Sequence, residues 1–321
     1  MYALSVTPAA EKTKPPAKSP FSRRRTHIPE ASKPCIERDC AEVCRRASGP
    51  IALAPMPTPT QHQKAARFRA LHEGDPFVIP NPWDAGSAKV LAGLGFKALA
   101  TTSSGFAFTL GRPDGGVTLG ELVDHVQLLD GATDLPLSVD LENGFGPGPE
   151  DAARAIGRIA EAGAVGGSIE DYDAEDGIYG IERATERVAA ACEAARRLDF
   201  PFTLTARAEN HVRGNPDLDD TVARLQAYER VGADVLFAPG LHSAEEIRAV
   251  AEGIGRPLNV LAIPSLSLEQ IVDAGAQRVS VGGRLAWAAV GAMAETAEQI
   301  RDRGDFSSLP GPTQVAEWLS G

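Results

Sequence analysis

The sequence predicts an α/β fold, a (β/α)8 or TIM-type barrel. From Phe77 onward, short apolar runs alternate eight times with Ala-, Glu- and Arg-rich segments of helical spacing, and eight β-then-α units are what such a barrel requires. Several helical segments end at a glycine, as at Gly163 and Gly232, because glycine tolerates the left-handed turn that ends a helix. A doubly wound open sheet is the alternative, although eight strands are more than that fold requires.

Each expected strand is a short apolar run followed by an amphipathic segment or a polar loop. The expected strands are residues 76–81, 98–103, 135–141, 165–170, 202–208, 234–239, 258–263 and 278–282, and the clearest helices between them are 151–162, 182–198, 219–231 and 244–253. After the eighth strand, residues 285–301 predict a long helix, and a Pro-Gly-Pro linker at 310–312 separates it from a short amphipathic tail at 313–319. The tail either packs on a partner subunit or folds back on its own barrel.

Composition divides the chain into two regions. Residues 1–58 are rich in Pro, Ser, Lys and Arg without helical or strand period, so we expect a disordered basic leader, and residues 59–321 form the barrel catalytic domain with its helical tail. The net charge is −11 although residues 1–55 carry ten basic against five acidic residues, and such an acidic body argues against a nucleic-acid partner. Without a membrane-length apolar run or a disulfide framework, we expect a cytoplasmic protein with no membrane contact.

Two carboxylates end the third strand, in the stretch 137–146. Asp140 and Glu142 are two residues apart, so a strand directs both to the same side. They stand at the carboxyl end of the strand, where parallel α/β folds bind ligands. Because two like charges so close are costly, the pattern predicts a cation or a shared proton between them. The alternative is that one of them caps the next helix or lies in solvent.

The other strand ends also carry polar side chains, which a barrel brings to one mouth. Four or five acids with one arginine predict a site for a hard cation with oxygen ligands, Mg²⁺ or Mn²⁺. Arg207 would bind a substrate carboxylate through its planar fork, unless it pairs with Glu209 or Glu170. In strand order the residues are Asn81, Trp83 and Asp84; Thr101, Thr102, Ser103, Ser104, Gly105, Arg112 and Asp114; Asp140 and Glu142; Ser168, Glu170 and Asp171; Arg207, Glu209, Asn210 and His211; and His242.

Two residue types are missing from the strand ends. No lysine follows Lys97, which begins a strand at the opposite end of the barrel, so Schiff-base chemistry with an inward lysine is excluded for this barrel. Cys192 falls within a predicted helix rather than at a strand end, which argues against a catalytic thiol.

Six stretches, in this order, resemble the motifs of the isocitrate lyase/phosphoenolpyruvate mutase superfamily, and the resemblance covers roughly residues 60–305. They are N-P-W-D-A-G-S-A at 81–88, T-T-S-S-G at 101–105, L-G-R-P-D at 110–114, V-D-L-E-N-G-F-G at 139–146, I-E-D at 169–171 and T-A-R-A-E at 205–209. The resemblance implies a barrel enzyme that holds a 2-oxo acid or its enolate on Mg²⁺. It also implies a homo-oligomer, a dimer or a tetramer, that exchanges its eighth helix between subunits.

The same resemblance implies roles for single residues. Asp140 would lie nearest the metal, and Glu142 and Glu170 would hold its waters; Glu142 replaces an aspartate of the family. Ser104 and Gly105 would cradle the substrate carboxylate or oxyanion. Arg207 would bind the substrate, and Asp114 would serve in binding or catalysis. The other expected substrate-binding residues are Trp83, Thr102 and Glu209. The candidate proton carriers are His242, Tyr179 and His211. The alternative for each of these three is that it is an ordinary polar residue of a loop.

Two departures from the family bear on the reaction. The carbon–carbon lyases carry a loop cysteine after the fourth strand, and the phosphonomutases carry a lysine after the Glu-Asp pair, whereas residues 170–180 contain neither and Tyr172 follows Asp171. We therefore expect a Mg²⁺-dependent, phosphonomutase-like enzyme acting on a 2-oxo acid through an enolate, with P–C or C–C bond cleavage or formation. The alternatives are a lyase or oxaloacetate decarboxylase of the same superfamily, a catalytically silent protein that binds oxalate or a 2-oxo acid, and a phosphate-binding barrel, which Val281-Gly282-Gly283 suggests.

Overall fold

The structure, a computed structural model, describes residues 58–311 and 315–319. The predicted leader therefore lies outside the described residues, apart from Thr58. Within the described part no helix is long and apolar enough to cross a membrane.

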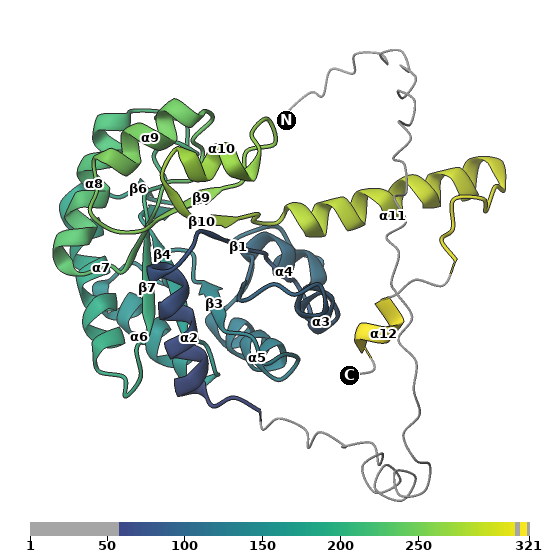
Figure 1. The fold of residues 1–321 in the computed structure, drawn as a ribbon, viewed down its shortest axis with the longest axis horizontal. Coiled ribbons are helices and arrows are strands. Elements are labelled where there is room, and N and C mark those ends of the chain that lie inside the picture. The colour runs from purple at the N-terminus through teal and green to yellow at the C-terminus, as the bar shows by residue number, and fades with distance from the viewer. Residues whose placement is uncertain (1–57, 312–314, 320–321) are drawn as a thin grey trace, which may run out of the picture. The chain divides into compact units, whose positions relative to one another are not determined.

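Eight parallel strands form a nearly closed barrel with helices between them (Figure 1). The two strands at the ends of the sheet meet at one seam, where the Ala100 N–H donates to the Pro80 carbonyl over 3.1 Å. The predicted barrel is thereby confirmed, and the open sheet is wrong. In spatial order the strands are β1 (Phe77–Ile79), β10 (Ala276–Ser280), β9 (Leu258–Leu261), β8 (Val235–Phe237), β7 (Thr203–Arg207), β4 (Gly166–Glu170), β3 (Leu137–Asp140) and β2 (Leu99–Ala100).

Asn81 ties this seam together just beyond β1. Its side-chain amide donates to the Thr101 carbonyl over 2.9 Å, and its side-chain oxygen accepts from the N–H groups of Val281 and Gly282 at 3.0 and 2.9 Å. Since Asn81 is buried, these bonds satisfy polar groups that have no access to water. One side chain thus fastens the carboxyl ends of β1, β2 and β10 to one another.

Every predicted strand is present, and seven of the eight lie within their expected ranges. β10 begins at Ala276, two residues earlier than expected, directly after Gly275, whose φ of 112° suits a turn. The helices are α2 (Gln61–Glu73), α3 (Ala85–Gly93), α4 (Ser103–Thr109), α5 (Leu119–Asp130), α6 (Pro149–Glu161), α7 (Ile181–Arg196), α8 (Leu218–Val231), α9 (Ala244–Glu252), α10 (Leu268–Asp273), α11 (Arg284–Arg303) and α12 (Val315–Leu319).

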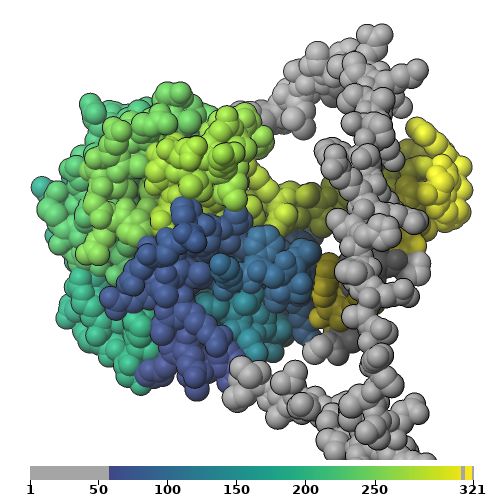
Figure 2. Space-filling view, in the orientation of Figure 1, coloured from purple at the N-terminus to yellow at the C-terminus, as the bar shows by residue number. Residues whose placement is uncertain are grey.

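Helix α2, which the sequence did not predict, lies across the amino ends of the strands and crosses the face seen in Figure 2. Gln277, in β10, donates to the Leu71 and Gly74 carbonyls, and the buried Lys64 pairs with Asp130 at 2.7 Å. The mouth that carries the expected site residues therefore lies at the other end of the barrel, where the carboxyl ends of the strands are.

A small antiparallel hairpin follows β4, formed by β5 (Tyr172–Asp173) and β6 (Gly177–Ile178). Its turn is organised by Asp173, whose carboxylate accepts from the N–H groups of Glu175 and Asp176 at 2.8 and 3.1 Å. The sequence does not predict this hairpin, because two-residue strands are too short to show a period of two. It holds Tyr172 at the barrel mouth.

The long helix α11 leaves the barrel instead of packing along it (Figures 1 and 2). Of its 20 residues only Ala286 is buried, while Trp287 and Met293 are 50% and 62% exposed. The tail helix α12 contacts α3, where a Cβ added to Gly93 would collide with the indole of Trp318. Within this one chain, the tail helix therefore packs on its own barrel unit.

Candidate active site

Asp140 occupies the carboxyl end of β3 and is held by backbone groups on two sides. The Ser103 and Glu142 N–H groups donate to its two carboxylate oxygens, each over 3.3 Å, and its own N–H donates to the Thr101 hydroxyl over 2.8 Å. Its carboxylate is 17% exposed. The loops after β2 and β3 therefore orient one carboxylate while leaving part of it accessible.

Arg207 is the cation at the centre of this mouth. Its guanidinium lies 3.3 Å from the Glu170 carboxylate and 3.8 Å from Asp140, and its Nε donates to Glu209. Pairing of β4 with β7 places Glu170 directly opposite Arg207. Burial by itself would lower the pKa of Arg207, but Glu170, Glu209 and Asp140 raise it above its ordinary value. The arginine therefore stays charged, and it makes both ion pairs that the sequence left open.

Arg213 is a second cation at this mouth, and sequence reasoning missed it. Its Nε lies 3.0 Å from Glu209, its Nη2 lies 3.7 Å from Glu170, and its guanidinium carbon lies 3.6 Å from the ring centroid of Tyr172. One helical turn positions it, because the Arg213 N–H donates to the Glu209 carbonyl. The spacing of four residues between Glu209 and Arg213 is the signal that could have found it.

Negative charge still exceeds positive charge around these arginines. Burial, Asp140 and Asp114 raise the pKa of Glu142 to about 7, although Arg207 and Arg213 act in the opposite direction. Burial also raises the pKa of Glu170 well above its usual value. The backbone of Glu142 has a φ of 49°, a region that residues with a side chain rarely adopt. The loop after β3 thus holds a carboxylate in an uncommon conformation beside other carboxylates.

Asp171, expected among the polar residues at the end of the fourth strand but without a predicted role, supports the site through buried hydrogen bonds. Its side chain is buried and accepts from the Glu209 N–H at 2.7 Å, from Arg224 at 3.0 Å and from the Tyr228 hydroxyl at 2.6 Å. These bonds connect the end of β4 to the loop after β7 and to α8. Asp171 therefore fixes the backbone from which Glu209 reaches both Arg207 and Arg213.

Two adjoining chambers open at this mouth, and Ser103, Asp114 and Arg207 line both. The smaller, about 200 Å³, is also lined by Asp140, and the larger, about 440 Å³, is also lined by a set on the hairpin side. Within residues 58–311 and 315–319, no three Asp, Glu, His or Cys side chains lie close enough together to hold a metal ion. The predicted carboxylates thus share one mouth without converging on one point. The hairpin-side set is Glu142, Glu170, Tyr172 and Arg213.

The stretch after β2 supplies the wall of the smaller chamber. Thr102 and Ser104 line it, and their hydroxyl oxygens lie 3.2 Å apart. Gly105 and Trp83 lie behind this wall, because a Cβ on Gly105 would meet the Thr102 methyl at 2.6 Å and the Trp83 Cβ at 3.1 Å. Only glycine allows α4 to start so close to the loop after β1.

The three candidate proton carriers lie outside both chambers. His242 is exposed, and its N–H donates to Glu246. His211 is buried without a hydrogen-bond partner for either ring nitrogen among the described residues, and burial lowers its pKa. The Tyr179 hydroxyl accepts from the Asn143 amide at 3.3 Å, and burial raises its pKa. Glu209 is also outside the chambers and fully buried, so it can reach a ligand only through the arginines.

Comparison with known proteins places this site in context. Residues 68–301 match the family model described as phosphoenolpyruvate phosphomutase. A putative lyase/mutase from Burkholderia cenocepacia J2315 is 50% identical, with a TM-score of 0.78 over 81% of this chain and 97% of that one. A 2-methylisocitrate lyase from Halalkalibacterium halodurans is 32% identical over 62% of this chain and 67% of its own. An oxaloacetate acetylhydrolase in complex with its product oxalate is 26% identical, with a TM-score of 0.73 over 80% and 94% of the two chains.

Proposed function

Since this chain belongs to the phosphoenolpyruvate phosphomutase family, within a superfamily of mutase and lyase enzymes, we propose that it is a Mg²⁺-dependent enzyme acting on a small 2-oxo acid. The observation that carries the proposal is the position of Arg207, 3.3 Å from Glu170 and 3.8 Å from Asp140 at the mouth of the barrel. A carboxylate-binding cation and a set of cation-binding oxygens are the two parts that a chelating oxo acid needs.

The donor atoms of the mouth are of the type that a hard divalent cation prefers, although the three carboxylates do not converge on one point among the described residues. Asp140, Glu142 and Glu170 offer only oxygen donors, the type that Mg²⁺ prefers. Even with two arginines nearby, burial raises the pKa of Glu142 to about 7, with smaller contributions from the charges of Asp140 and Asp114. A bound cation would offset both the burial and the repulsion. Asp140, Glu142 and Glu170 would hold the ion, which when bound would supply positive charge to stabilise an enolate oxygen.

The chain's own side chains would bind and orient the substrate. Arg207 donates to the substrate carboxylate, with Glu209 fixing the plane of its guanidinium. Ser104, in the wall of the smaller chamber, holds the opposite side through its hydroxyl and neighbouring N–H groups. Asp114, in the exposed loop before α5, lines both chambers and lies where it can close over a bound molecule.

The finer assignment concerns the bond that reacts, and we propose phosphonomutase-like P–C chemistry. Two guanidiniums, of Arg207 and Arg213, face the chambers, and they match the charge of a phosphonate beside a carboxylate. The hairpin from Tyr172 to Ile178 has no thiol to protonate a carbon leaving group. The alternative is C–C cleavage or decarboxylation. The similarity to a 2-methylisocitrate lyase and an oxaloacetate acetylhydrolase favours substrates in which a C–C bond reacts.

A panel assay tests the proposal. Pyruvate release would be followed in Mg²⁺ with phosphonopyruvate, oxaloacetate, 2-methylisocitrate and dimethylmalate, and phosphonopyruvate rearrangement by ³¹P NMR. We expect turnover of a single class of substrate, inhibited by oxalate and by EDTA. Phosphonopyruvate turnover would support the mutase-like assignment. Turnover of oxaloacetate, 2-methylisocitrate or dimethylmalate would support the alternative.

Asp140→Asn is the decisive variant in this assay, with Asp124→Asn, an exposed aspartate on α5, as the matched control. We expect Asp140→Asn to lose at least a hundredfold in kcat/KM, because it removes a charged oxygen donor, and Asp124→Asn to keep wild-type activity. Mg²⁺-dependent oxalate binding without turnover of any substrate would contradict the proposal and favour a binding protein.

The proposed enzyme is a homo-oligomer, a dimer or a tetramer. Helix α11 exposes Leu285, Trp287 and Met293 to solvent in the single chain, and exposed apolar side chains in such number mark an association surface. An exchange of this helix between subunits would cover them.

A further inference from the structure

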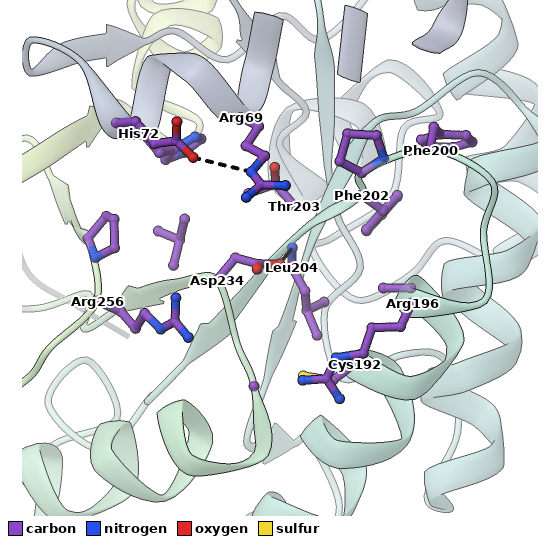
Figure 3. A pocket seen from close by; sticks show the side chains of 16 residues that line it. Arg69, His72, Cys192, Arg196, Phe200, Phe202, Thr203, Leu204, Asp234 and Arg256 are labelled. Atoms are coloured by element: carbon purple, nitrogen blue, oxygen red, sulfur yellow. Dashed lines mark hydrogen bonds and ion pairs between the residues drawn. The ribbon is translucent and has the colours of Figure 1, made fainter. Parts of the chain in front are cut away.

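A further cavity lies at the end of the barrel opposite the two chambers of the mouth (Figure 3). Its volume is about 460 Å³, within the range typical of small-molecule sites. Its walls come from the ends of α2 and α7 and from the residues that begin or immediately precede β7, β8 and β9. None of these residues lines either catalytic chamber, so the cavity is separate from the proposed active site.

Three arginines from three different elements line this cavity. Arg69 lies on α2, Arg196 ends α7, and Arg256 precedes β9. Figure 3 shows their guanidiniums on different sides of Asp234. Burial raises the pKa of the Asp234 carboxyl, and the three arginines lower it, which is consistent with charges that lie near one another without direct pairing.

Two of these arginines lack a carboxylate partner. Among residues 58–311 and 315–319, neither Arg196 nor Arg256 forms an ion pair, and Arg196 has a single hydrogen bond, to the Val231 carbonyl at 3.3 Å. Arg69, by contrast, pairs with Glu73 at 3.2 Å. Asp234 is already engaged through one oxygen by the Leu204 N–H at 2.8 Å. The free donors of the cavity therefore belong to Arg196 and Arg256.

The lining is positively charged within a chain that is acidic overall. Three arginines face two carboxylates, Glu73 and Asp234, whereas the net charge of the chain is −11. His72 adds no positive charge near neutral pH, because burial lowers its pKa to about 3. The remaining wall is largely apolar and includes Phe200 and Phe202. An arginine rim over an aromatic and aliphatic wall suits an anionic group attached to an apolar body.

We propose that this cavity binds a small organic anion. Its carboxylate or phosphate group lies between Arg196 and Arg256, and its apolar part packs on the wall that contains Phe200 and Phe202. Guanidiniums bind a carboxylate or a phosphate through paired N–H donors. The structure therefore leaves both groups open, and a binding experiment with one probe of each kind distinguishes them.

Isothermal titration of the full chain in EDTA, with phenyl phosphate, benzoate and inorganic phosphate as probes, tests the proposal. We expect one site per chain, with phenyl phosphate or benzoate binding at least tenfold more tightly than inorganic phosphate, because only the first two reach the apolar wall. The better of the two identifies the anionic group. No measurable binding of either aromatic anion at millimolar concentration would overturn the proposal.

Variants locate the bound probe. Arg256→Gln and the double change Arg196→Gln/Arg256→Gln should weaken binding at least tenfold, and Arg67→Gln, an exposed arginine of α2 outside the cavity, should not. The three side chains are exposed, so circular dichroism is expected to match the wild type. Binding that survives the double change would show that Arg196 and Arg256 do not hold the probe. Binding that Mg²⁺ with oxalate displaces would place the probe at the catalytic mouth. Either result would overturn the proposal.

Discussion

The guanidinium carbon of Arg213 lies 3.6 Å from the centre of the Tyr172 ring. Tyr172 occupies the position at which the sequence lacks a basic residue after the Glu170-Asp171 pair. Arg213 arrives there from the next strand in the barrel, through the helical turn that begins at Glu209. A positive charge that the local sequence lacks is thus present at the mouth, and the tyrosine ring orients it.

Arg213→Gln tests this relationship. If Arg213 binds a second anionic group of the substrate, its loss removes charge-assisted hydrogen bonds of about 1.5–3 kcal/mol. We expect KM to rise about tenfold to a hundredfold for the substrate found in the panel assay, with a smaller change in kcat. Steady-state kinetics of purified protein provides the measurement.

Two controls accompany this variant. Tyr172→Phe keeps the ring beneath the guanidinium and should retain KM within about threefold, and Arg248→Gln changes an exposed arginine on α9 and should have no effect. An unchanged KM in Arg213→Gln would show that the arginine serves only its ion pairs with Glu209 and Glu170.

Asp171→Asn is expected to destabilise the fold strongly. The change leaves Arg224 without its buried partner at 3.0 Å, and breaking one side of a buried pair typically costs about 3–5 kcal/mol. Tyr228→Phe removes only the hydroxyl that donates to the same carboxylate and should cost about 1–3 kcal/mol. Urea unfolding followed by circular dichroism measures both.

The free-energy costs of Asp171→Asn and Tyr228→Phe should not be additive, because both changes affect the same hydrogen bond, from the Tyr228 hydroxyl to the Asp171 carboxylate. We expect Tyr228→Phe to cost less in the Asp171→Asn background than in the wild type. A cost below about 1 kcal/mol for Asp171→Asn would mean that this network does not hold the site together.

His125 should make the protein less stable in mild acid. Its ring is buried and stacked on Phe106 with centroids 3.8 Å apart, and burial lowers its pKa from 6.5 to about 4 despite the opposing charge of Asp84. Between these two pH values the unfolded chain binds a proton at His125 that the folded chain does not. The free energy of unfolding therefore decreases as the pH falls from about 6.5 to about 4, by about 1.4 kcal/mol per pH unit from this group.

His125→Gln isolates that contribution. Unfolding by urea at pH 7 and at pH 5.5 should show a smaller loss of stability in His125→Gln than in the wild type, even though the variant loses the ring contact at both pH values. His62→Gln, in which an exposed histidine is replaced, should follow the wild type. Equal pH dependence in all three proteins would contradict a buried neutral His125.

Helix α11 should control the oligomeric state. Met293 is 62% exposed in the middle of this helix, and a charge placed there would be buried without a partner if the helix packs on a second subunit. We expect light scattering after size exclusion to show a dimer or tetramer for the wild type and a smaller species for Met293→Glu. Glu295→Gln, an exposed neighbour, should stay assembled. A monomeric wild type would contradict the exchanged helix.

Much of the architecture could be predicted from local pattern. Each strand is a short apolar run, and each run ends in polar residues, so the order of the strands along the chain and the residues at their carboxyl ends follow from the sequence. The carboxylate end of β3 at Asp140 and the arginine end of β7 at Arg207 lie at one mouth for this reason.

The barrel and most of the chemical groups at its mouth can therefore be predicted from the sequence, because period and residue type are local properties of the chain. Which of these groups touch depends on the folded structure. Arg213 over Tyr172, Asp171 between Glu209 and Tyr228, and the placement of His242 away from both chambers all depend on contacts between distant elements. Such contacts depend on how side chains pack across the assembled barrel, and no spacing along the chain encodes that packing.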